Sequence, residues 1–153
     1  MPWLDFGPQA QQVSAPDFRL QTPDGATVTR RGFHSRAHLV LCFLPEALSA
    51  ADRARLQHLA DAQEEIAGAA ARLIVLTGRA EALPPALPLL LDPDRAVRRS
   101  YGALFPPEQA PAEDEPFVII LDRFGAPAFA AVGLPDADDV LTRLWGLQYE
   151  CPE

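Results

Sequence analysis

Cysteine is scarce in this sequence, because only Cys42 and Cys151 among 153 residues carry a thiol. A disulfide framework or a paired-ligand zinc site needs more cysteines or histidines at short spacing, so neither is expected. His34, His38 and His58 show no metal-ligand spacing with one another or with a cysteine. We therefore expect surface or structural histidines, and a protein with no metal and no cofactor.

The sequence also has few basic residues and no long apolar runs. The chain has 13 basic against 21 acidic residues, for a net charge of -8, and its arginines are scattered rather than clustered. Nucleic-acid binding draws on clustered basic side chains, so a nucleic-acid partner is not expected. No segment reaches the roughly 18 consecutive apolar residues that span a membrane, and the N-terminus lacks the basic region and unbroken apolar stretch of a secretory signal. We therefore expect a cytoplasmic protein without a membrane partner.

What is present fits a single folded domain that alternates strand-like and helix-like segments. Hydrophobic residues make up 48% and charged residues 22% of the chain, which is ordinary for a globular protein. The predicted strands are 18–20, 27–29, 39–44, 73–77, 89–91, 117–121 and 126–132, and the predicted helices are 49–68, 92–102 and 136–147. This order predicts the α/β class, with a central sheet covered by helices on both faces.

Several residues mark the ends of the predicted helices. Ser49 can cap the first of them. In the second, Asp92 is placed as the cap, with Pro93 at the first helical position, and Arg98 and Arg99 favour the negative end. Asp136 is predicted to cap the third.

Three stretches together resemble the peroxiredoxin-like (AhpC/TSA, "redoxin") family of the thioredoxin-like superfamily. They are APDFRLQTPDG at 15–25, LPLLLDPDRAVRRSYGAL at 87–104 and FVIILDRFGAPAFAAVG at 117–133. Each alone is weak, but the three occur in the family's order and spacing, and the resemblance covers about residues 13–145. It implies a thioredoxin-like fold with a mixed sheet over 13–147, an N-terminal extension at 1–12 and a C-terminal tail at 148–153.

The sequence departs from the resembled family where the family does its chemistry. That chemistry needs a cysteine thiolate at the start of the helix after the first central strand, where the helix dipole lowers the thiol pKa. The corresponding segment holds Pro45, Glu46, Leu48, Ser49 and Ala51 and contains no cysteine. Neither the single cysteine of peroxiredoxins nor the Cys-x-x-Cys of thioredoxins, expected near Leu48 and Ala51, is present. We therefore interpret this segment as a degenerate active site in which Ser49 is a helix cap.

Pro116 stands where the resembled peroxiredoxins have an arginine that helps to hold peroxide. Its place instead resembles that of the proline that many thioredoxin-like proteins hold in cis beside the active site, so the resemblance implies a cis Glu115–Pro116 bond. The alternative is a trans proline at an exposed strand end.

The remaining chemically capable residues have simpler explanations. Cys42 lies within an apolar strand, where burial would raise its pKa and make it inert. Cys151 lies three residues from the end among negative charges; a frayed tail is its default interpretation, although an exposed thiol there can form mixed or intermolecular disulfides. The acidic run Glu113-Asp114-Glu115 is typical of a solvated loop.

Three functions remain open for a protein of this kind, and whether it is an enzyme is undecided. The first is a non-catalytic redoxin-like protein that binds a protein or small-molecule partner. The second is a residual thiol-dependent antioxidant or oxidoreductase that uses Cys151. The third is a small-molecule binder with a pocket lined by Pro45, Leu48, Pro116 and Phe117. The oligomeric state is open between monomer and homodimer, with a dimer favoured because redoxin relatives often dimerise.

Overall fold

A computed structural model of the protein describes residues 3–7, 14–78, 83–84 and 87–150, with side chains described up to 147. Its elements are β1 (Leu4–Asp5), β2 (Arg19–Gln21), β3 (Thr27–Thr29), η2 (Arg31–Phe33), β4 (His38–Phe43), α1 (Ala50–Asp61), α2 (Gln63–Gly68), β5 (Ala71–Thr77), β6 (Leu89–Leu91), α3 (Ala96–Gly102), η3 (Pro107–Gln109), β7 (Phe117–Leu121), β8 (Pro127–Val132) and α4 (Ala137–Glu150). Among the described residues, no helix is long and apolar enough to cross a membrane.

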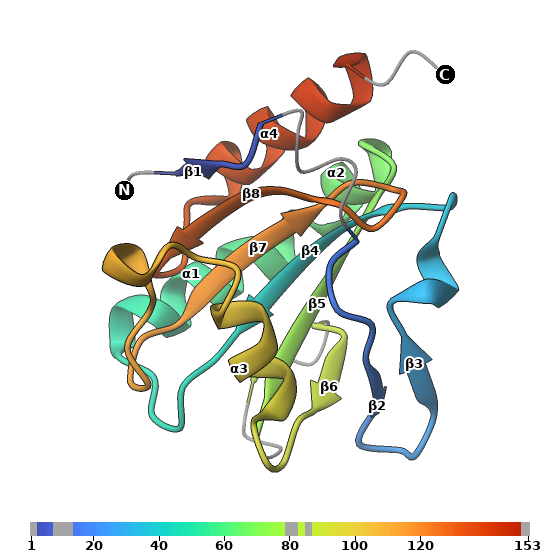
Figure 1. Ribbon diagram of the computed structural model, residues 1–153. Coiled ribbons are helices and arrows are strands. Elements are labelled where there is room, and N and C mark those ends of the chain that lie inside the picture. Colours follow the sequence, from blue (N-terminus) through green and yellow to red (C-terminus); the bar gives the residue numbers. More distant parts are fainter. Residues whose placement is uncertain (1–2, 8–13, 79–82, 85–86, 151–153) are drawn as a thin grey trace.

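The strands form one mixed sheet in the order β1-β8-β7-β4-β5-β6-β2-β3. β4 runs parallel to β5, and β5 parallel to β6, whereas β7 and β8 join as an antiparallel hairpin. α1, α2 and α4 cover one face of this sheet, and the short α3 lies on the other (Figure 1). The predicted α/β architecture with helices on both faces is confirmed.

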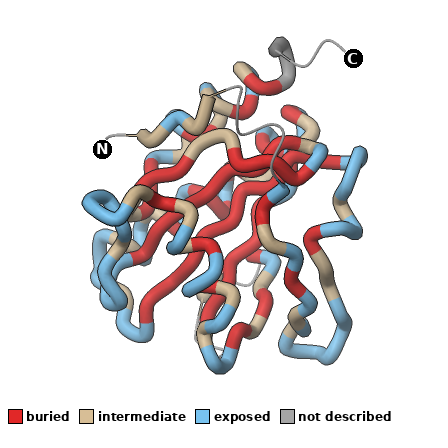
Figure 2. The backbone as a smooth tube through the Cα atoms, in the orientation of Figure 1, coloured by how far each residue is buried: buried red, intermediate tan, exposed pale blue. Residues whose placement is uncertain are grey.

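The centre of the sheet is buried on both faces because its strands carry almost no polar side chains. All six residues of β4 are buried, and they alternate between two cores. Val40 and Cys42 pack in the cluster beneath α1, α2 and α4. Leu39, Leu41 and Phe43 pack in the cluster beneath α3. The buried positions run as continuous stretches through the middle of the sheet, whereas the loops at its ends are exposed (Figure 2).

β1 and α4 lie near the two ends of the chain. β1 pairs with β8 through Leu4 opposite Ala130, so part of the segment 1–12 forms an edge strand of the sheet. At the other end, α4 continues to Glu150.

Two helices differ from the sequence prediction. The single helix expected over 49–68 is divided at Ala62, whose N–H is shared between the carbonyls of His58 and Leu59, both at 3.1 Å. This local tightening bends the chain where Ala62 is buried against the core.

The helix expected from Asp92 begins four residues later, at Ala96. Arg95 precedes it with a φ of 60°, so the chain makes a turn before the helix and Pro93 lies outside it. Asp92 still caps the helix, but from a distance: its buried carboxylate accepts hydrogen bonds from the N–H groups of Val97 at 3.3 Å and Arg98 at 2.9 Å. Residues 92–95 form this turn, in which the Arg95 N–H donates to the Asp92 carbonyl at 3.0 Å. The turn brings the Asp92 carboxylate to the N–H groups of the second and third helical residues.

Candidate active site

The candidate active site lies where β4 ends and α1 begins. Pro45 is buried, Leu48 is half-buried, and Glu46 and Ala51 are exposed. Ser49 precedes α1 and its Oγ accepts a hydrogen bond from the Asp52 N–H at 3.0 Å, which confirms the predicted cap. One N–H group at the positive end of α1 is therefore satisfied by a neutral hydroxyl, which is not a useful nucleophile without an adjacent base.

A buried cation that sequence reasoning missed closes this end of the sheet. Arg98 is 7% exposed and its Nη2 donates to the backbone carbonyls of Ala112 at 2.9 Å, Glu113 at 3.3 Å and Glu115 at 2.5 Å. Its Nη1 lies 3.5 Å from the Phe43 carbonyl at the end of β4. The guanidinium thereby ties the loop before β7 to the end of β4.

The electrostatic surroundings of Arg98 are mixed. Burial is the largest cause that lowers the pKa of the guanidinium, and Arg95 lowers it further, while the carboxylates of Glu113, Asp114 and Asp92 oppose the shift. The ring of Phe117 lies 4.9 Å below the guanidinium carbon and adds a cation–π contact. An arginine stays charged in such surroundings, so the site holds a permanent positive charge whose Nη1 and Nη2 both donate hydrogen bonds.

The prediction that Arg98 lies at the negative end of its helix is wrong. Because α3 begins at Ala96, Arg98 lies in its first turn and its side chain leaves the helix toward the loop. One signal in the sequence could have predicted that the Arg98 side chain is buried. Tyr101 follows three residues later on the same helical face, and in the structure it is fully buried.

Pro116 is buried, and the cis Glu115–Pro116 bond implied by the family resemblance is wrong: the peptide bonds of the described residues are trans. The carbonyls on both sides of this bond are engaged, since that of Glu115 accepts from Arg98 and that of Pro116 accepts from the Gly133 N–H at 2.7 Å. The trans bond directs these two carbonyls to their separate partners.

Leu48 and Phe117, which were expected to line one pocket, pack in clusters on opposite faces of the sheet. Leu48 packs against the cluster beneath α1 and α4. Phe117 belongs to the cluster beneath α3, where it stacks on Phe43 at 4.6 Å and meets Phe105 edge-on at 5.5 Å.

The sulfur chemistry of the described residues is confined to the core. Cys42 is fully buried, and burial raises the pKa of its thiol from an ordinary 9.0 to about 12, which agrees with the prediction that it is inert. Cys151, the candidate tail thiol, lies outside the described residues.

The histidines do not form a ligand set. His34 and His58 are exposed, whereas His38 is buried at the start of β4. Among the described residues, no three histidine, cysteine or carboxylate side chains come together in a way that could hold a metal ion. His34 instead packs edge-on against Phe124, with ring centroids 6.0 Å apart.

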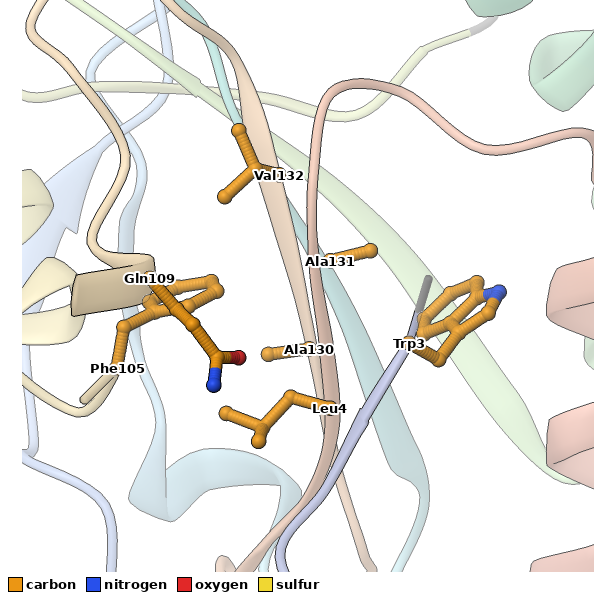
Figure 3. Close-up of a pocket in the computed structure, with 7 residues that line it drawn as sticks. All are labelled: Trp3, Leu4, Phe105, Gln109, Ala130, Ala131 and Val132. Carbon is orange, nitrogen blue, oxygen red and sulfur yellow. The ribbon is translucent and has the colours of Figure 1, made fainter. Parts of the chain in front are cut away.

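A cavity of about 210 Å³ adjoins the closed corner on the α3 face and the edge of the sheet. Its lining residues are Trp3, Leu4, Phe105, Gln109, Ala130, Ala131 and Val132. The carboxamide of Gln109 points from η3 toward Leu4 and Ala130, and Trp3 stands on the other side of β8 (Figure 3). Sequence reasoning did not find this cavity, because its walls come from the chain's first residues, from η3 and from β8, which only the sheet brings together.

The fold and this corner define the class of protein to which the chain is similar. The sequence matches no protein-family model and no curated protein. Its structure resembles Prx1a of Plasmodium yoelii with a TM-score of 0.70 and 16% identity, covering 91% of each chain. It resembles peroxiredoxin Q of Xanthomonas campestris with a TM-score of 0.69 and 19% identity, over 88% of this chain and 94% of that one.

A thioredoxin is among the similar structures as well. The exposed lipoprotein thioredoxin Etrx1 of Streptococcus pneumoniae has a TM-score of 0.64 and 20% identity, and the match covers 84% of this chain and 98% of that one. The chain therefore has the thioredoxin fold. Within it, the architecture is similar to that of peroxiredoxins, as the sequence motifs predict.

Proposed function

We propose that this is a peroxiredoxin-like protein of the thioredoxin fold that acts as a binding or interaction module, without peroxidase or disulfide reductase activity. The observation that carries the proposal is the corner between β4, α1 and β7. Its segment 45–51 holds no thiol, and Arg98 ties the neighbouring loop across the sheet end through backbone carbonyls.

The chemistry explains why this corner is unsuited to peroxide. In thiol peroxidases a thiolate attacks one peroxide oxygen, the O–O bond breaks, the sulfur becomes a sulfenic acid, and the other oxygen leaves as water or alcohol after protonation. That step needs an accessible thiolate, whereas Cys42 is protonated and buried at neutral pH. The guanidinium of Arg98 is engaged by carbonyls rather than directed at a substrate.

Binding would use the cavity beside the corner. Its walls are largely apolar, and the Gln109 carboxamide offers one donor and one acceptor. This composition suits an uncharged apolar group that carries a single amide or hydroxyl.

The alternative is a residual thiol-dependent activity that uses Cys151. One observation favours this alternative. The sequence has two cysteines, and because Cys42 is buried, a thiol-dependent activity would have to use Cys151. Such an activity would need a dithiol reductant to return the sulfenic acid to the thiol, and a disulfide between two tails would also produce a homodimer.

Hydrogen peroxide consumption in the presence of dithiothreitol tests the proposal. We expect wild type to consume peroxide no faster than buffer with the same reductant. Activity that disappears in Cys151→Ser would establish the alternative, and activity that persists in Cys151→Ser would refute both. Sedimentation with and without dithiothreitol shows whether any dimer depends on the tail sulfur.

The binding part is tested separately with benzamide as the probe. We expect benzamide to shift the amide resonances of β8 and η3, and Val132→Phe, which fills the cavity from a half-buried position, to abolish the shifts. Val28→Phe, a half-buried valine on β3, is the matched control and should leave them intact.

A further inference from the structure

A second, separate groove lies at the other end of the α3 face, between β5 and β6 on one side and β3 and η2 on the other. Its volume is about 150 Å³, and it is lined by Thr22, Val28, Phe33, Arg72, Leu73, Ile74, Pro88, Leu89 and Leu90. The described lining residues are shared with neither the corner near Arg98 nor the cavity beside β8. Figure 1 shows β2 and β3 at the end of the sheet beside β6.

The groove exists because the β2–β3 hairpin is joined to the sheet at one end. In the described residues, the pairing of β2 with β6 is limited to Gln21 opposite Leu91. The pairing of β5 with β6 begins only at Val75 opposite Leu89. Beyond these points the hairpin side and β5 are not bonded as neighbouring strands, and apolar side chains rather than backbone pairs line the space between them.

The walls of the groove favour an apolar occupant. Ile74 and Leu90 are buried members of the α3-face cluster, and Val28 and Phe33 pack half-buried against the same cluster. A cavity of about this volume lined by aliphatic and aromatic side chains is large enough for a benzene ring. An occupant of that size would remove the half-buried apolar side chains from water.

One cation stands beside this apolar space. Arg72 is the charged residue among the nine described lining residues, and its side chain is exposed. It lies two positions before Ile74 on β5, so strand alternation places it on the same face. It forms no ion pair with any other described residue. An apolar groove with an exposed guanidinium at its rim is complementary to a molecule with an apolar body and one carboxylate.

We propose that this groove binds small monocarboxylates whose apolar part is about the size of a benzene ring. The apolar part lies between Val28, Phe33 and Ile74, and the carboxylate pairs with Arg72 at the rim. This site does not rest on the proposed loss of redox activity, and its described lining residues differ from those of the cavity beside β8.

Phenylacetate and its uncharged counterpart 2-phenylethanol are suitable probes, titrated into the full chain with amide resonances as the readout. Because an exposed ion pair contributes at most about 1 kcal/mol, we expect phenylacetate to bind wild type more tightly than 2-phenylethanol, by up to about fivefold. Both probes should shift resonances of β3, β5 and β6. Raising the salt concentration should reduce the preference for the acid.

Arg72→Gln should remove this preference and leave the binding of 2-phenylethanol unchanged. Arg99→Gln, an exposed arginine of α3, is the matched control and should retain the preference. Val28→Phe should weaken both probes at least tenfold by filling the groove, whereas Val132→Phe should weaken neither.

The proposal is overturned if phenylacetate shifts no resonance of β3, β5 or β6 at millimolar concentration. It is equally overturned if Arg72→Gln binds the acid as well as wild type does, because the guanidinium would then play no part. Because Arg72 is exposed, we expect Arg72→Gln to fold normally, so the proposal can still be tested if Val28→Phe fails to fold. Neither result bears on peroxide turnover or on benzamide binding.

Discussion

Replacing Arg98 with methionine tests whether one side chain holds the loop before β7 against the end of β4. Methionine has a similar length and keeps some of the apolar contact with Phe117, but it cannot donate a hydrogen bond. The change therefore removes the Arg98 hydrogen bonds of four backbone carbonyls, those of Phe43, Ala112, Glu113 and Glu115. The Ala112 carbonyl still accepts from the Glu115 N–H at 3.1 Å.

The size of the stability loss depends on whether these carbonyls find other hydrogen-bond donors. Hydrogen bonds to a charged donor contribute about 1.5–3 kcal/mol each, but three of the four share Nη2 and do not add in full. Ala112, Glu113 and Glu115 are exposed, so their carbonyls can regain water once the loop loosens, while the Phe43 carbonyl sits in a buried residue. We expect Arg98→Met to lower the free energy of unfolding by about 3 kcal/mol, and Arg98→Lys, which keeps the charge but loses the planar fork, to lower it by about 2 kcal/mol.

Urea unfolding followed by circular dichroism measures the loss, and hydrogen exchange locates it. We expect faster amide exchange throughout residues 106–116 in Arg98→Met, with little change in β5 and β6. Arg99→Met is the matched control, because Arg99 is the exposed neighbour on the same helix and should change stability by less than about 0.5 kcal/mol. A loss below about 1 kcal/mol with unaltered exchange in the loop would show that Arg98 does not hold this corner closed.

Further predictions concern the thiol, the cap and one glycine. The thiol of Cys42 is protonated in the folded state up to a pKa of about 12, whereas the unfolded thiol ionises near 9.0. Between these values the folded state binds more protons, so stability should fall by about 1.4 kcal/mol per pH unit above pH 9 in urea unfolding, and Cys42→Ala should reduce that slope by this amount. Ser49→Ala should cost about 1 kcal/mol of thermal or urea stability through loss of the cap on Asp52; an unchanged midpoint would contradict the cap. In Gly125→Ala, at a φ of +86°, the new Cβ would lie 2.1 Å from Arg30 Nη1, so we expect a loss of about 3 kcal/mol. Gly25→Ala, at a φ of +95° with nothing within 4 Å, should lose only about 1 kcal/mol, and equal losses would exclude the clash.

Local physical signals account for what could be predicted correctly. The apolar runs of β4, β5 and β7 are strands because they are short, unbroken and buried on both faces. The Asp122–Gly125 turn joins β7 to β8 as expected, since Gly125 supplies the positive φ. The cap by Ser49 depends on residues within one turn, so it too could be inferred.

The errors arise where a residue's partner lies outside its own helix or strand. The start of α3 depends on Asp92 reaching over a turn to Arg98, and the place of the Arg98 side chain depends on carbonyls of a loop fourteen or more residues later. The trans state of Pro116 goes with the same long-range contacts, which a local resemblance does not record.

The sequence by itself determined the alternation of strands and helices, the absence of a thiol at the start of α1 and the burial of Cys42, because each depends on composition or on spacing along one element. The thioredoxin-like fold was implied by the family resemblance of three stretches of the sequence. Only the tertiary structure decided that Arg98 closes the end of the sheet, that Leu48 and Phe117 face opposite cores, and that Arg72 stands beside an apolar groove. The physical reason is that a cavity or a buried charge is formed by elements remote in the chain, and sequence periodicity describes one element at a time.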